Sequence, residues 1–177
     1  VWFREYKDDF LLFQKKIFVV LIIKKYICMK LTTNNLIHTT HSLRVRYGET
    51  DPMKFVYYGN YAEYLEVARV ELFRTIGISY DEIENQGIWL PVSEFKIKYI
   101  RPALYDEILE IHTFIKKIPG VRIEFEYEIF NTKKEKITEA ATTLFFMDSK
   151  TQKVIRCPEF LMKIIEKNWN PNESFYQ

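Results

Sequence analysis

The stretch NYAEYLEVARVELFRTIG, residues 60–77, carries the pattern that decides the fold. Its apolar residues recur at spacings of three and four, which places them on one face of a helix of about five turns. Those residues are Tyr61, Tyr64, Leu65, Ala68, Leu72, Phe73 and Ile76. Gly77 is a natural stop for the helix. A single long helix with one apolar face must be buried by the elements around it.

The residues after this helix alternate with period two, which is typical of strands. Four such runs lie around residues 95–99, 111–115, 121–129 and 140–146. One wet face in each run predicts an antiparallel sheet that is covered on one side. A further strand is predicted at 43–47, and short helices at 79–86 and 158–167. The fold class is therefore α+β, a long central helix wrapped by a curved antiparallel sheet.

The regular pattern begins at Ser42, so we expect one domain over residues 42–168 and a C-terminal tail over 169–177. Residues 1–41 are interpreted as an irregular N-terminal extension. The apolar run at 17–23 is too short to cross a bilayer, which needs ~20 residues. We expect that translation begins at Met29 and that residues 1–28 are upstream sequence. A peripheral membrane helix in that segment is the alternative.

Composition excludes several classes of function. The formal charge is +2, and residues 1–28 hold six basic and three acidic residues, so the rest of the chain has no basic excess. That balance argues against a nucleic-acid-binding protein. Two cysteines, Cys28 and Cys157, do not form a disulfide framework, which favours a cytoplasmic location. His38 and His41 have no cysteine or acid at ligand spacing, so we expect no metal site, and no nucleotide-binding motif indicates a cofactor.

The stretch before the helix, RYGETDPMKFVYYGNY at residues 46–61, resembles the signature of the 4-hydroxybenzoyl-CoA thioesterase family. The pair Ala68-Arg69 and the segment at 90–92 are also similar to that family. The resemblance covers residues 42–168. It implies the hotdog fold, hydrolysis of an acyl-CoA thioester to free acid and CoA, and assembly as a homodimer or homotetramer. It also implies that Asp51 is the catalytic carboxylate, a nucleophile or general base, and that the backbone N–H of Tyr58 is the oxyanion donor.

Elementary chemistry agrees with these roles. The N–H groups in the first turn of a helix lack intrahelical partners and carry partial positive charge. A thioester carbonyl docked there is polarised, and a nearby carboxylate such as Asp51 can attack it or activate a water. The alternative is that Asp51 only caps a turn. Glu49 is interpreted as a solvated loop acid rather than a second catalytic carboxylate.

Substrate contacts are predicted for Tyr57, Asn60 and Tyr61, although the two tyrosines suit the core or a dimer contact first and the lining of an acyl pocket second. Arg101 and Arg122 are the candidates for the CoA phosphates, because arginine binds phosphate bidentately. Neighbouring lysines are better explained as charges on a solvated sheet face. Relatives commonly have glycine where this chain has Lys54 and its neighbours, so we expect a loop of different shape, with consequences for substrate size and rate.

Two other functions fit the same fold. One is a thioesterase that acts on acyl carrier protein conjugates. The other is a non-catalytic module that binds acyl-CoA. Fold alone does not decide among these functions.

Overall fold

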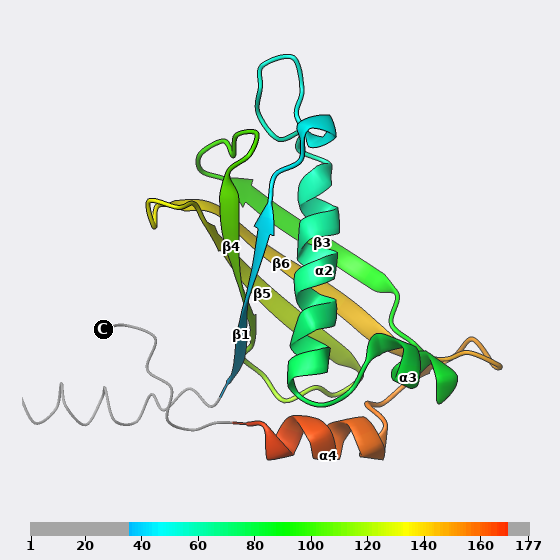
Figure 1. The fold of residues 1–177 in the computed structure, drawn as a ribbon. Coiled ribbons are helices and arrows are strands. Elements are labelled where there is room, and N and C mark those ends of the chain that lie inside the picture. The colour runs from blue at the N-terminus through cyan, green and yellow to red at the C-terminus, as the bar shows by residue number, and fades with distance from the viewer. Residues whose placement is uncertain (1–35, 170–177) are drawn as a thin grey trace, which may run out of the picture. The chain divides into compact units, whose positions relative to one another are not determined.

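A computed structural model describes residues 36–169, and its arrangement is drawn in Figure 1. One long helix lies across an antiparallel sheet, with two shorter helices beside it. In chain order the elements are β1 (Ile37–Arg44), the 3-10 turn η1 (Tyr47–Glu49), α2 (Asn60–Thr75), α3 (Tyr80–Asn85), β2 (Ile88–Trp89), β3 (Val92–Tyr99), β4 (Ile108–Ile115), β5 (Arg122–Phe130), β6 (Lys136–Asp148), β7 (Val154–Ile155) and α4 (Glu159–Lys167). The predicted α+β class is confirmed.

The sheet has the order β1-β4-β5-β6, and β3 pairs with the other side of β6. All of its pairings are antiparallel. Two short strands, β2 and β7, pair with the last residues of β6. They were not predicted, because two residues are too few to show an alternating pattern. Within the described part of the chain, β1 and β3 are therefore the edges of the main sheet.

The core lies between α2 and the inner face of the sheet. The predicted apolar face of the helix is buried, and Phe73 meets Phe125 of β5 and Tyr80 of α3 edge-on, with ring centroids 5.8 and 5.7 Å apart. Gly77 follows the helix with a φ of +97°, and the N–H of Ile78 donates to the carbonyl of Phe73 at 3.0 Å. This left-handed ending, which glycine adopts readily, confirms the predicted stop.

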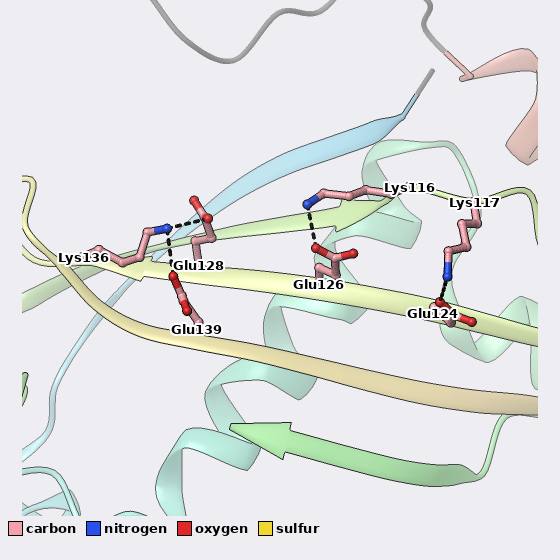
Figure 2. Close-up of polar contacts among 7 residues, drawn as sticks. All are labelled: Lys116, Lys117, Glu124, Glu126, Glu128, Lys136 and Glu139. Atoms are coloured by element: carbon pink, nitrogen blue, oxygen red, sulfur yellow. Dashed lines mark hydrogen bonds and ion pairs between the residues drawn. The ribbon is translucent and has the colours of Figure 1, made fainter. Parts of the chain in front are cut away.

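The outer face of the sheet is charged. Successive inward residues of β5 are buried, so the glutamates between them project outward, where Figure 2 shows them paired with lysines. Glu126 pairs with Lys116 at 2.6 Å and Glu124 with Lys117 at 2.7 Å. Lys136 bridges Glu128 and Glu139 at 2.6 and 3.2 Å. Such exposed pairs contribute at most about 1 kcal/mol each.

The first strand differs from the prediction. β1 begins at Ile37 rather than near Ser42, and it ends at Arg44, so the boundary expected between 41 and 42 falls inside a strand. The polar run Thr39-Thr40-His41 conceals the alternation on this edge strand. His38 is not in a solvated tail, because its Nε2 lies 3.0 Å from Nδ1 of His112. Burial, together with His112, lowers the pKa of His38 to about 4. Residues 1–35, including Met29 and Cys28, lie outside the described residues.

The C-terminal helix α4 packs on the core through Leu161 and Ile165. Pro158 is its N-cap rather than its first helical residue. Just before it, Cys157 is buried, and its N–H donates to the carbonyl of Gly120 at 2.7 Å. Burial raises the pKa of the Cys157 thiol to about 12. In residues 36–169, no helix has the length and apolar character needed to span a bilayer.

Candidate active site

The loop that carries Asp51 is held closed by its own backbone. The N–H of Asp51 donates to the carbonyl of Phe55 at 2.8 Å, and Thr50 and Val56 form a bridge across its base. Oδ1 of Asp51 accepts the N–H groups of Met53 and Phe55 at 2.8 and 3.3 Å. Asp51 therefore does cap a turn, as the alternative interpretation held. Within residues 36–169, Oδ2 accepts no hydrogen bond, so the second oxygen of this half-buried carboxylate is available for chemistry.

The long helix begins directly after this loop, and Figure 1 shows the loop at the N-terminal end of α2. The N-cap is Gly59, which supplies no side-chain cap. Among the described residues, the N–H of Tyr58 has no acceptor, while its carbonyl accepts the hydroxyl of Tyr99 at 3.1 Å. A free donor at the start of a helix is suited to bind a negatively charged oxygen.

Glu49 is not the solvated acid that the sequence predicted. It is 7% exposed, because the η1 turn and α2 enclose it. Its Oε2 accepts the N–H of Arg46 and the hydroxyl of Tyr64, both at 2.7 Å. Burial alone would raise the pKa of Glu49, but the hydrogen bonds from Tyr64 and Arg46 hold it below its ordinary value. The carboxylate is therefore kept ionised in the folded protein.

The residues predicted to contact the acyl group occupy different surroundings. Tyr57 and Tyr58 are 47% and 64% exposed, with ring centroids 4.5 Å apart. Asn60 is tied down, since its Nδ2 donates to the carbonyl of Glu49 at 2.7 Å. Tyr61 is only 2% exposed and packs against Tyr99 in the core. Of these residues, Tyr57 and Tyr58 have the most exposed side chains.

The structure does not bring the two predicted phosphate-binding arginines together. Arg101 donates its N–H to the carbonyl of Ile137, at the start of β6, and pairs with Glu135 at 3.3 Å. Arg122 lies opposite Phe145, near the far end of β6, with its guanidinium 5.0 Å from that ring. At ~3.3 Å per strand residue, the two positions are roughly 26 Å apart.

Only one of the two arginines lies near the Asp51 loop. Phe55 forms a bridge with Leu104, three residues after Arg101. Arg122 instead lines an open pocket of about 320 Å³ with Lys117, Ile118, Gly120, Val121 and Glu124. Lys116 and Lys117, which the sequence suggested are charges on a solvated face, are indeed paired with glutamates on the outer face of the sheet.

The loop with Asp51, the open start of α2 and the helix-on-sheet fold agree with one family of known proteins. Residues 45–165 match the model of the thioesterase-like superfamily. The chain belongs to that superfamily. The predicted relationship to the 4-hydroxybenzoyl-CoA thioesterases, and with it the hotdog fold, is thereby confirmed.

Three relatives illustrate the range of the superfamily. "Putative acyl-CoA thioesterase YneP" of Bacillus subtilis is 33% identical over 114 residues, which cover 64% of this chain and 83% of that protein. The chloroplastic acyl-acyl carrier protein thioesterase ATL2 of Arabidopsis thaliana is 33% identical over 132 residues, 73% of this chain and 70% of that protein. A solved DHNA-CoA thioesterase from Staphylococcus aureus has 34% identity and a TM-score of 0.70, covering 73% of this chain and 89% of that one.

Sequence reasoning missed two buried charged residues of this superfamily member. Glu49 was missed because its partner Tyr64 is fifteen residues away, beyond any local pattern. Arg69, on α2, is as buried as Glu49, and its Nε has no hydrogen-bond partner in the described part of the chain. It lies beside the hydroxyls of Tyr80 and Tyr127. Its position on the apolar face of the helix, next to Ala68 and one turn before Phe73, was the available signal.

Within the Asp51 loop, Lys54 has a φ of +66°. The lysine thus occupies the left-handed region that a glycine enters without strain. For a residue with a Cβ atom that conformation costs roughly 1–2 kcal/mol.

Lys54→Gly is therefore expected to stabilise the protein by about 0.5–1 kcal/mol, the strain relieved less the extra entropy that glycine has in the unfolded chain. A denaturant titration measures the change. Gln152→Gly is the matched control, because Gln152 has a φ of +53° in a turn after β6. Both variants should gain stability, and only Lys54→Gly should alter KM. A loss of stability in Lys54→Gly would contradict the strain argument.

Proposed function

We propose that this protein is an acyl-CoA thioesterase, in which Asp51 is the nucleophile or general base and the N–H of Tyr58 is the oxyanion donor. The observation that carries the proposal is that two groups without hydrogen-bond partners in residues 36–169 lie in the segment that leads into α2. One oxygen of Asp51 accepts two N–H groups and the other accepts none in residues 36–169. The N–H of Tyr58 has no acceptor in the same part of the chain.

The reaction follows from this pairing. The thioester carbonyl docks on the N–H of Tyr58, which is reinforced by the positive end of the helix dipole. Asp51 then attacks the carbonyl carbon, or removes a proton from a water that does so. The carbonyl oxygen gains negative charge at the donor, the C–S bond breaks, and CoA leaves as the thiol after protonation. In the nucleophilic route, water hydrolyses the resulting anhydride and restores Asp51.

The exposed rings of Tyr57 and Tyr58 offer an apolar surface for the acyl group at the entrance to this site. Arg101, which follows β3 and lies three residues before Leu104 at the Asp51 loop, is the candidate for a phosphate of CoA. Its pairing with Glu135 leaves it exposed at the surface, where a phosphate can compete for it. Acyl carrier protein conjugates are the second candidate substrate, on the similarity to ATL2.

A thiol-release assay on the purified protein tests the proposal. The panel contains aromatic and aliphatic acyl-CoAs of several lengths, and matching acyl carrier protein conjugates. Turnover of at least one acyl-CoA, with release of the free acid, is expected. Turnover of carrier-protein conjugates alone would favour the second substrate class. Binding of acyl-CoA without turnover of any thioester would establish the non-catalytic module instead.

A homodimer or larger homo-oligomer is part of the proposal, and the edge strand β3 is its expected contact. In the described residues β3 pairs only with β6, and Phe95 on it is 44% exposed. An open apolar edge is a ready template for a second strand. Glu94 and Lys96 also alternate along it, so an antiparallel copy would oppose unlike charges.

Sedimentation at micromolar concentration is expected to give a dimer or tetramer, and Phe95→Glu should shift it towards the monomer by placing a charge in the contact. Ile118→Glu is the matched control, since Ile118 is about equally exposed but lies in the turn between β4 and β5. A wild-type protein that is monomeric and fully active would contradict this assembly.

The cytoplasmic location stays a prediction.

A further inference from the structure

Glu49 is the only buried acid among residues 36–169. It lies two residues before Asp51, in the turn that joins β1 to the catalytic loop. A buried carboxylate costs free energy unless its oxygens are fully hydrogen-bonded. Hydrogen bonds must therefore offset the cost of burying Glu49.

Both oxygens of this carboxylate are fully occupied. Oε1 accepts a hydrogen bond from Nε–H of Arg46 at 2.6 Å and lies 2.5 Å from Nη2 of the same guanidinium. Oε2 accepts the backbone N–H of Arg46 and the hydroxyl of Tyr64, both at 2.7 Å. No lone pair remains with room to take a proton from a substrate or a water. Glu49 is thus unsuited to act as a second catalytic base.

The backbone of Glu49 makes a second set of contacts. Its carbonyl accepts the N–H of Tyr57 at 2.9 Å and Nδ2 of Asn60 at 2.7 Å. These two donors lie on either side of Tyr58, whose N–H is the proposed oxyanion donor. Glu49 therefore joins the η1 turn before Asp51 to the chain that enters α2.

The side chain completes the connection. Tyr64 is on α2, one turn after Asn60, and is buried against Tyr61. Its bond to Oε2 ties the carboxylate to the helix itself, while the bonds from Arg46 tie it to the end of the segment after β1. The Glu49 anion is the point at which the loop and the helix are joined.

We propose that Glu49 is a positioning residue, whose ionised side chain fixes Asp51 relative to the N–H of Tyr58. The inference rests on the proposed function, since it acts through Asp51. A displacement of about 1 Å between reacting groups lowers rates by about 10²-fold. Glutamine keeps the size of the side chain but offers one acceptor oxygen in place of two, and its NH₂ group would face a donor of Arg46 or Tyr64.

Three variants test the inference: Glu49→Gln, Asp51→Asn and the double variant. With the best acyl-CoA as substrate, Glu49→Gln is expected to lower kcat at least tenfold and to change KM less than threefold. In the Asp51→Asn background it should cause no further loss, because a residue that acts only through Asp51 has nothing left to position. Hydrogen exchange should accelerate at the amides of Met53 and Phe55, which hold Asp51, and stay unchanged along β5.

Glu82→Gln is the matched control. The carboxylate of Glu82 accepts the N–H of Ser79 at 2.7 Å, just as Glu49 accepts the N–H of Arg46, also three residues before it, but at the start of α3. This variant should leave kcat unchanged. A kcat for Glu49→Gln equal to that of the control, or a further loss in the double variant, would overturn the inference while leaving Asp51 in place. Normal turnover by Asp51→Asn would instead overturn the proposed function, and with it the role of Glu49.

Discussion

Asp51→Asn is expected to lower kcat by about 10²-fold or more, the scale of a lost general base or nucleophile. Asparagine keeps the size of the side chain, and its carbonyl oxygen can still accept the N–H groups of Met53 and Phe55. The turn should therefore persist while the negative charge is lost. KM and the melting temperature are expected to change little. Steady-state thiol release and a thermal melt measure both effects.

Asp148→Asn distinguishes catalysis from turn capping. Oδ1 of Asp148 accepts the N–H groups of Lys150 and Thr151 at 3.2 and 2.7 Å, in a turn of similar design after β6. Loss of its charge should leave kcat near the wild-type value. If Asp51→Asn behaves like this control, Asp51 only caps its turn and the assignment is wrong. Asp51→Glu should also lower kcat, because it displaces the carboxylate by about a bond length.

Phe73→Ala is expected to destabilise the protein by about 3–5 kcal/mol, the usual cost of removing a large buried aromatic side chain. Phe73 joins three elements, since its ring meets Phe125 of β5 and Tyr80 of α3 and is itself carried by α2. Truncation to alanine leaves a cavity where these three elements meet. The melting temperature should fall by on the order of 10 °C.

Val67→Ala is the control for Phe73→Ala, because Val67 lies on the same helix with its side chain exposed. Its effect should stay within about 0.5 kcal/mol. At low temperature, folded Phe73→Ala should retain most of its kcat, since Phe73 lies roughly 20 Å along the helix from Asn60 at ~1.5 Å per residue. A stability change below about 1 kcal/mol would show that the helix does not depend on this contact.

The sequence predicted the elements whose pattern is local and regular. The apolar face of α2, its end at Gly77 and the alternation of β5 could each be read from a few neighbouring residues, and all are confirmed. The short helix predicted at 79–86 was equally local: α3 begins after Ser79, and both hydrogen bonds of the capping box between Ser79 and Glu82 are present. In these segments, local propensity and burial favour the same structure.

The predictions that were wrong concern features that depend on contacts between residues far apart in the sequence. β1 is a strand because it pairs with β4 across some seventy residues, and its own polar sequence gave little sign of it. The burial of Glu49 depends on Tyr64 of α2, and that of Arg69 on a helix face whose neighbours come from α3 and β5. The roles of Asp51 and of the N–H of Tyr58 are predictions from a family motif. The hydrogen bonds that join their loop to α2 were not predicted.

The buried Cys157 gives this protein an internal indicator of unfolding. A thiol with its pKa raised to about 12 is almost wholly protonated at neutral pH, and the protonated form is a poor nucleophile. Disulfide reagents that report the CoA released by catalysis should therefore leave Cys157 unlabelled while it stays buried in the folded core. Slow labelling of Cys157, followed by mass spectrometry of the peptide that contains it, would count the molecules in which the C-terminal helix has opened. The same thiol reagent would then measure both catalytic turnover and the frequency of local unfolding around Cys157.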